Sequence, residues 1–396
     1  MKLLRFEFKK NFRKPFLWLV LAGLLALNAF VIVRENGTVY VGQFAGRLDS
    51  KAAFEKLYRE KLRGELTREK AEFVIAEFNR LTKVINARTY RTTYDPETYT
   101  GYEYLDWYLF SADFYRPMSY LSGYARTAKE IAARAEAYAT FYADHGVEYQ
   151  VRKNNQIIST FQNRKLSAFY NTYGIDYYLT YTFSSLLILI FLTLSLAPVF
   201  SVEHDTEMGK ILSVSKTGTK KIAAIKIWSS LIWTGFVFLL FKLTEWIVFS
   251  VTFGFDGLEL PLYGLKTYQY TFLSLQIRDF VFLSRGLELF FCLIFAMILL
   301  LLSEWIGKPA LAFPLGIAAG ASLYWLNPET MPQLPGWLTI VNPGSLLRNV
   351  FLFGDFSAVN VLNYPIFRVV LALISSSLIF LLLLSGLILS MRRKRI

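Results

Sequence analysis

The residues that could carry chemistry in this 396-residue chain form no catalytic motif. The sequence contains no Gly-x-x-x-x-Gly-Lys-Ser/Thr phosphate loop, no Gly-x-Ser-x-Gly turn and no His-Glu-x-x-His helix. Its two histidines, His145 and His204, are far apart, and neither has ligand-type neighbours at metal-site spacing. We therefore expect a chain that is not an enzyme, binds no cofactor or metal, and does not hydrolyse ATP by the phosphate-loop route.

The most informative charges lie in a polar, lysine-rich segment, residues 201–226, between two long apolar runs. Glu203 and Glu207 stand where the first turn of a helix favours acids. Met208, Ile211 and Leu212 then recur at helical spacing, which predicts a short helix with one apolar face. Such a helix either lies on a lipid surface or docks into a soluble partner, and these residues alone leave both interpretations open.

The end of that segment indicates a turn into the next apolar run. Gly218 allows backbone angles that other residues avoid. Lys220 and Lys226 follow it and are placed to face lipid phosphates. A lysine excess beside the ends of apolar runs favours the cytoplasmic side of a membrane.

Charged residues also occur inside an apolar run. Lys242 and Glu245 are three residues apart, so they lie on one face of a helix. A charge at the centre of a bilayer costs about 2.5–3.5 kcal/mol, and such residues pair or face protein. The two form a candidate intramembrane polar pair, unless both lie near the outer interface and extend to water.

These residues must be positioned by membrane helices, because a hydrophobic content of 54% is too high for an ordinary soluble protein of this length. We predict an all-α polytopic membrane protein with six transmembrane helices and both termini in the cytoplasm. Gly316 and Gly320 have the small-residue spacing that allows two helices to approach closely. The predicted spans are residues 15–33, 177–200, 227–253, 286–306, 309–327 and 364–391.

The segments outside the predicted spans divide into two sets, one on each side of the membrane. A basic amphipathic helix over residues 1–14, the loop 201–226 and the basic tail 392–396 are predicted on the cytoplasmic side. Residues 34–176, 254–285 and 328–363 are predicted outside, the second of them as an extracellular or re-entrant segment. The net charge of +13 is concentrated beside the spans, which indicates attraction to membrane lipid and argues against nucleic-acid binding.

Residues 34–176 are predicted to form a large, mainly helical extracellular domain between the first two spans. Mixed charges accompany a stripe of apolar residues at helical spacing, Val74, Phe78, Leu81 and Ile85. About 140 residues suffice to bury a core. The many tyrosines and phenylalanines form either that core or a ligand surface, and the core interpretation is favoured.

An ordered set of residues in the polar segment resembles a known family. The set is Phe200, Glu203, Glu207-Met208, Ile211-Leu212, Ser215-Lys216, Gly218, Lys220 and Lys226. It is similar to the cytoplasmic coupling segment of ABC-2 type permeases, the membrane subunits of ABC exporters, in the form seen in Gram-positive bacteria. The resemblance covers roughly residues 150–326. Gly209-Lys210 and Lys220 depart from it, since many relatives have Gly-Thr and an arginine there.

The resemblance implies the permease subunit of an ATP-driven exporter in a bacterial cell membrane. It implies two copies of an ABC ATPase subunit, which bind ATP and Mg²⁺, and a second permease chain, identical or related. The expected substrate is an amphipathic peptide, an antibiotic or a lipid-like molecule. The alternative is a membrane-anchored receptor or sensor whose extracellular domain binds a ligand. The residues expected to couple to the ATPase are Glu203, Glu207, Met208, Ile211, Leu212, Gly218 and Lys220.

Overall fold

The computed structural model describes residues 2–41, 54–89, 107–205, 219–326, 331 and 333–393. These residues are mostly helical, and five of their helical segments are long and apolar enough to cross a membrane. The remaining predicted span, the fifth in the chain at residues 309–327, corresponds to a 17-residue apolar helix, Pro309–Trp325. The five segments are Pro15–Glu35, Tyr173–Glu203, Lys221–Thr252, Ile277–Ile306 and Arg368–Met391.

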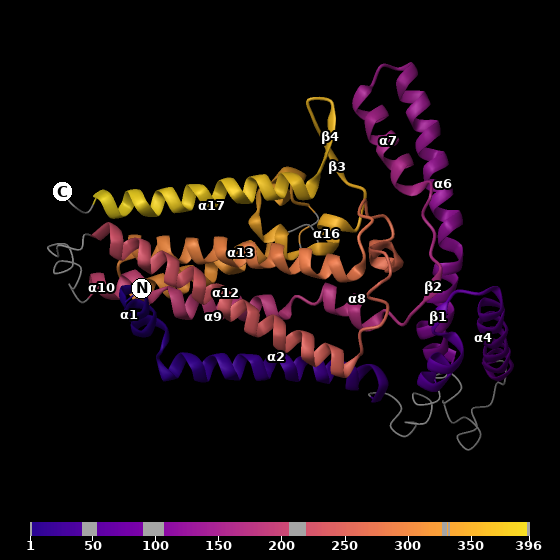
Figure 1. Cartoon of the computed structure of the whole chain (residues 1–396), viewed down its shortest axis with the longest axis horizontal. Helices are drawn as coiled ribbons and strands as arrows, with labels where there is room; N and C mark the ends of the chain where they lie inside the picture. Colours follow the sequence, from indigo (N-terminus) through magenta and orange to yellow (C-terminus); the bar gives the residue numbers. More distant parts are fainter. Residues whose placement is uncertain are drawn as a thin grey trace.

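The long apolar helices lie alongside one another as a bundle (Figure 1). Helix α13 is at its centre and contacts α9, α12, α14 and α17. More than half of its residues are buried, as expected of a helix enclosed by others. Helices α2 and α17 instead expose apolar residues such as Leu19 and Leu382. The bundle helices are α2 (Pro15–Val41), α9 (Phe183–Leu196), α12 (Thr219–Thr252), α13 (Ile277–Ile306), α14 (Pro309–Trp325) and α17 (Arg368–Arg393).

The second span is interrupted near its end by Pro198, which cannot donate a backbone hydrogen bond. The hydroxyl of Ser303 on α13 donates to the carbonyl of Ala197 at 2.6 Å. The same oxygen accepts from the amides of Phe200 and Ser201, each at 3.0 Å. A neighbouring helix thus satisfies the polar groups at the break, as an apolar environment requires. The three parts of this span are α8 (Tyr173–Thr180), α9 and α10 (Pro198–Asp205).

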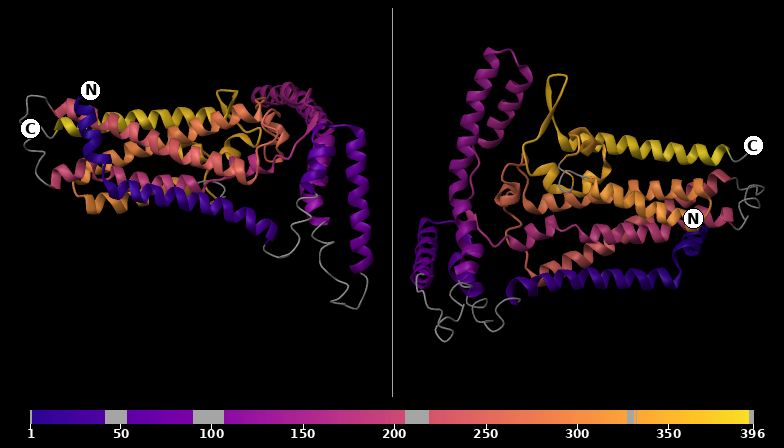
Figure 2. Two further views of the ribbon diagram at one scale, coloured as in Figure 1. Left: turned by 60° about the horizontal axis from the view of Figure 1, so that its bottom comes forward. Right: turned by 180° about the vertical axis from the view of Figure 1, so that it is seen from behind.

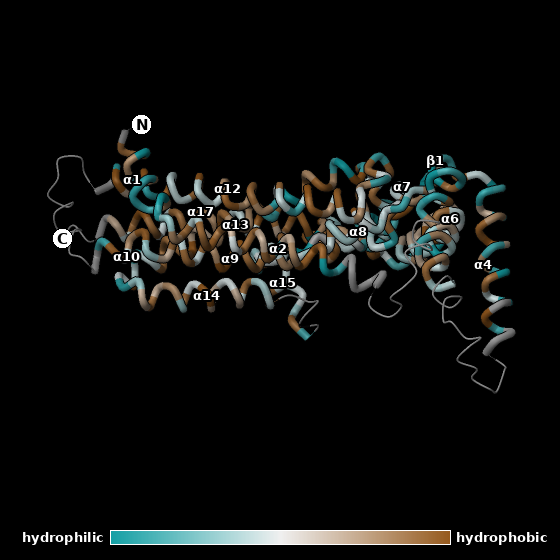
Figure 3. The backbone as a smooth tube through the Cα atoms, turned by 90° about the horizontal axis from the view of Figure 1, so that it is seen from below, coloured by the Kyte–Doolittle hydropathy of each residue, from teal (hydrophilic) through white to brown (hydrophobic). Residues whose placement is uncertain are grey.

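The two ends of the bundle differ. The N-terminal helix α1 (Lys2–Phe12), α10, the start of α12 and the end of α17 are together at one end. A separate helical domain caps the opposite end (Figures 1 and 2). Hydrophobic residues dominate the bundle, whereas hydrophilic ones are frequent in α1 and in the domain (Figure 3). The helix ends that flank residues 206–218 thus lie at the same end of the bundle as α1 and the end of α17.

The helical domain has its own core. Val74 and Leu81 are buried, as the predicted stripe requires, and Phe78 packs against them. Aromatic residues including Phe110 and Phe114 fill the interior, so these side chains serve packing. Its helices are α4 (Arg68–Thr89), α6 (Arg116–Asp144) and α7 (Glu148–Phe161), and β1 (Gly64–Glu65) pairs antiparallel with β2 (Ala168–Phe169).

The domain is fastened to the segment that joins α12 to α13. Arg164 is buried, and its guanidinium donates to the carbonyls of Thr271 at 2.8 Å and Leu273 at 3.0 Å. Tyr58 donates to the carboxylate of Asp256, and burial together with this bond raises the pKa of the phenol. The hydroxyl therefore stays protonated as a donor at physiological pH.

Replacing Arg164 with alanine is expected to loosen this attachment by about 3 kcal/mol, because two charge-assisted hydrogen bonds are lost. Limited proteolysis of the purified protein should then cut between domain and bundle far faster than in the unmodified chain. Arg134→Ala, an exposed change on α6, is the control and should leave the cleavage pattern unchanged. Equal protection of all three proteins would contradict a fastening role for Arg164.

Several predicted span boundaries differ from the structure, among them the start of the third span, which is at Lys221 and not at residue 227. Two further differences have a clear physical cause. Residues 254–285 were predicted to lie outside the span because Arg278, Asp279 and Arg285 lower the hydropathy of this stretch. In the structure, helix α13 already begins at Ile277. Helix α17 begins at Arg368, since Tyr364 starts the second strand of a hairpin whose turn residues Leu362 and Asn363 have φ of 50° and 66°. The remaining elements are η1 (Tyr58–Leu62), η2 (Ser111–Tyr115), η3 (Leu262–Gly264), η4 (Lys266–Tyr268), α15 (Gly336–Val341), η5 (Pro343–Leu347), α16 (Asn349–Phe353), β3 (Ala358–Val361) and β4 (Tyr364–Phe367).

Candidate functional site: two ion-pair networks in the bundle

A buried network of four charged side chains joins α12 to α13. Lys242 and Glu245 on α12 are both buried, with their ammonium and carboxylate 3.1 Å apart. The same ammonium is 2.9 Å from the carboxylate of Glu288 on α13. Arg285, one turn before Glu288, donates to it at 2.5 Å and has a second nitrogen 3.7 Å from Glu245. Two cations face two carboxylates, so this central network is electrically neutral.

Groups on α8 and α9 complete the central network. Ser184 donates to Glu245 at 2.6 Å and accepts from Lys242 at 3.1 Å. The Arg285 guanidinium donates to the hydroxyl of Tyr178 at 3.0 Å and to its carbonyl at 2.8 Å. It also lies 4.1 Å from the centre of the tyrosine ring. Side chains of the second, third and fourth spans therefore contact one another in one polar cluster inside an apolar bundle.

In the central network, Lys242 and Glu245 form an ion pair with each other, which argues against the alternative in which both extend to water. Both side chains point into the bundle and are enclosed by protein, so neither extends to water. Sequence reasoning missed Arg285 and Glu288, which fell at the expected boundary of the fourth span. Their cation-x-x-acid spacing repeats that of Lys242 and Glu245, and this repetition is the signal that could have identified the pairing.

A second network of charged side chains joins the helix ends at the end of the bundle where α1 lies, opposite the helical domain. Glu203 on α10 accepts from Lys10 on α1 at 2.6 Å and forms an ion pair with Lys226 on α12. Lys226 also donates to the carbonyl of Val199 at 3.3 Å, and its side chain is only 1% exposed. The prediction that Lys226 faces lipid phosphates is therefore wrong. We call this set the junction network.

The junction network gives Glu203 an intramolecular role in addition to the partner contact expected of it. Its carboxylate bridges the first helix, the end of the second span and the start of the third. Lys220 is in the first turn of α12. Five other residues expected to couple to an ATPase lie outside the described residues, namely Glu207, Met208, Ile211, Leu212 and Gly218.

The two glycines of α14 lie at close helix contacts. A Cβ atom at Gly316 would meet side-chain carbons of Leu299 and Thr193 at 2.7 Å, and one at Gly320 would meet Phe295 at 3.0 Å. Helix α14 therefore approaches α9 and α13 too closely for a larger residue at Gly316 without movement of its neighbours.

A cavity of about 430 Å³ lies between the helical domain and the bundle. Asp176 on α8 lines it, and one of its carboxylate oxygens accepts from Thr267 at 2.9 Å. The other oxygen is buried without a hydrogen-bond partner in the described part of the chain. Four tyrosines also line the cavity, Tyr108, Tyr120, Tyr170 and Tyr173.

Within the described ranges no group of three or more His, Cys, Asp or Glu side chains is placed to bind a metal ion. Comparisons with family models, curated proteins and solved structures give no match to the chain.

Proposed function

We propose that this chain is the permease subunit of an ATP-driven ABC exporter. In this proposal, six helices including the short α14 cross a bacterial cell membrane, and the termini are cytoplasmic while the helical domain is extracellular. Two copies of an ATPase subunit bind ATP and Mg²⁺, and a second permease chain completes the transport path. An amphipathic peptide, an antibiotic or a lipid-like molecule is the proposed substrate.

The observation that carries the proposal is the junction network. Glu203 and Lys226 join the two helix ends that flank residues 206–218, the segment that resembles a coupling segment. A displacement of that segment by an ATPase would therefore move α10 and α12 together. The central network links α12 to α13 and to α9, and α13 to α8, so the motion would continue toward the extracellular domain.

The topology can be tested by labelling a single cysteine in intact cells. Cys292 is the chain's one cysteine and is buried, so Cys292→Ser provides a background without thiols. We expect Lys216→Cys to react with a membrane-impermeant maleimide only after the cells are opened. A cysteine at exposed Glu136 on α6 should react in intact cells. The opposite pattern would contradict the orientation.

The partnership with an ATPase can be tested by copurification. The tagged chain, purified in mild detergent, should retain a P-loop ATPase in equal amount, and the complex should hydrolyse ATP. Leu212→Asp should remove the ATPase, because a charge cannot enter an apolar cleft. A wild-type chain that retains no ATPase under conditions that preserve a known ABC exporter complex would overturn the proposal.

The cavity beside Asp176 favours one second function, a receptor whose extracellular domain binds a ligand. An unpartnered carboxylate oxygen among tyrosine rings suits the cationic group of an organic ligand, and Arg116 and Lys266, which also line the cavity, suit an anionic group of the same ligand. Binding of a cationic peptide that is abolished by Asp176→Asn and unaffected by Leu212→Asp would support this function. If the same chain retains no ATPase, the receptor would replace the exporter.

A further inference from the structure

Three cations form a stripe at the N-terminal end of the chain. Arg5, Lys9 and Arg13 are four residues apart, so they lie on one face of α1 and its last turn. All three are exposed. Among the described residues none of them forms an ion pair, whereas neighbouring Lys10 is paired with Glu203. The stripe therefore presents three uncompensated positive charges.

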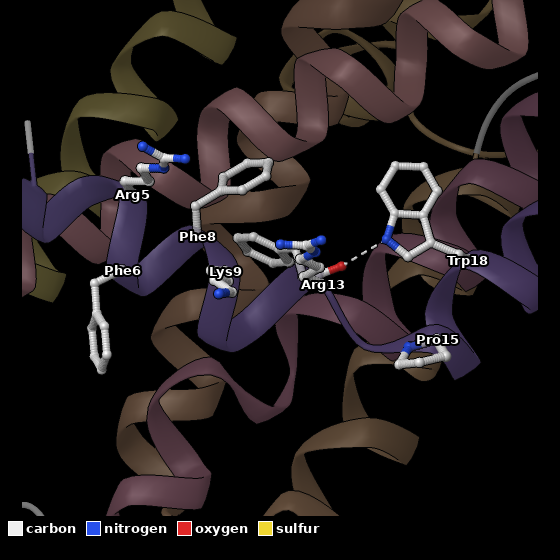
Figure 4. A pocket seen from close by; sticks show the side chains of 8 residues that line it. Arg5, Phe6, Phe8, Lys9, Arg13, Pro15 and Trp18 are labelled. Carbon is white, nitrogen blue, oxygen red and sulfur yellow. Dashed lines mark hydrogen bonds between the residues drawn. The ribbon is translucent and has the colours of Figure 1, made fainter.

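The stripe lines a cavity of about 830 Å³ at the bend between α1 and α2 (Figure 4). The indole of Trp18 donates to the carbonyl of Phe12 at 3.1 Å, which closes the bend. Phe12 stacks on Trp233 of α12 with ring centres 4.8 Å apart. No carboxylate of the described chain lines this cavity. Packed aromatic side chains thus form one side of the cavity, and the charged residues that line it are all cations.

The cavity is next to the surface that lipid would cover. Helix α2 begins at Pro15, and its residues Phe16 and Leu19 are exposed by 63% and 73%. Trp18 at the same level has the amphipathic ring that favours the membrane–water interface. The cationic residues of the cavity and the exposed apolar face of α2 therefore follow one another in the same order as the headgroup and the acyl chains of a phospholipid.

We propose that this bend binds one anionic phospholipid. Its phosphate lies among Arg5, Lys9 and Arg13, and its acyl chains follow the exposed face of α2. Guanidinium groups bind phosphate oxygens in a bidentate geometry, as they do carboxylates, and the adjacent exposed apolar face of α2 favours the phosphate of a phospholipid. The lipid holds α1 across the end of the bundle, beside the junction network, whether or not the chain is an exporter.

Native mass spectrometry of the delipidated full-length protein in detergent tests the site, with phosphatidylglycerol and phosphatidylcholine as probes. We expect one phosphatidylglycerol to bind in clear preference to phosphatidylcholine. Each Lys or Arg at an anionic surface strengthens binding about fivefold, so R5Q/K9Q/R13Q should weaken binding of this lipid roughly 100-fold. R5K/R13K keeps the charges and should lose only part of the affinity.

The matched control removes three cations from the other end of the chain, R392Q/R393Q/K394Q. A defined site predicts that this control binds phosphatidylglycerol as the unmodified protein does. Equal weakening by both triple changes would overturn the site in favour of diffuse attraction, as would equal binding of the two lipids. Should R5Q/K9Q/R13Q fail to fold, K9Q alone must still weaken binding severalfold, and unchanged binding would overturn the proposal.

Discussion

Arg285→Ala is expected to destabilise the helix bundle by about 3–5 kcal/mol, the largest loss of any single change in the spans. The guanidinium has charged or polar partners on both sides, with Glu288 at 2.5 Å and the Tyr178 carbonyl at 2.8 Å. Its removal leaves the central network with one excess negative charge enclosed by protein. An unpaired buried charge is far more unfavourable than the loss of a surface contact.

Thermal unfolding in detergent, followed by loss of the monodisperse peak, measures the effect. Arg278→Ala removes an equally large cation from the same helix, but this residue is 58% exposed, so the change should have almost no effect. Arg285→Leu with Glu288→Leu restores neutrality and should recover most of the stability. If the single and double changes were equally destabilising, packing around Arg285 would matter more than its charge.

Glu203→Ala has the second largest expected effect, again about 3–5 kcal/mol, because Lys226 would remain buried without its counter-ion. Lys10 is partly exposed and can turn to water, so it contributes less to the loss. We expect α1, α10 and α12 to lose their fixed arrangement, with reduced transport and reduced ATPase copurification. Membrane insertion should be unaffected, since the apolar spans are unchanged.

A second change separates the two roles of Glu203. Glu203→Ala with Lys226→Met removes both buried charges and should restore thermal stability. Transport and ATPase copurification should stay low if the Glu203 carboxylate also contacts the partner, and should recover if it serves only the junction network. Glu65→Ala, an exposed acid of the helical domain, should change neither quantity. Full transport by Glu203→Ala alone would contradict the coupling proposal.

The apolar helices could be predicted from sequence because hydropathy is a local property. The start of α13 could not, since Arg285 and Glu288 read as a boundary until Lys242 and Glu245 are placed opposite them. The same limit applies to Glu203, which was predicted in the first turn of a helix but lies in the last turn of α10, and whose partner Lys10 is 193 residues away. Charges that cancel across helices are visible only once the helices are packed.

Ser303 on α13 holds the break in the second span through a single hydroxyl group. One hydroxyl serves three backbone groups of the break, the carbonyl of Ala197 and the amides of Phe200 and Ser201. If that hydroxyl moves away, the two amides lose this partner together, whereas the Ala197 carbonyl still accepts from the hydroxyl of Ser201 at 2.8 Å. Release of α10 from α13 would thus break both amide contacts in one step. We therefore expect the end of this span to be either docked on α13 or free, so that a force on it would give a response with a threshold.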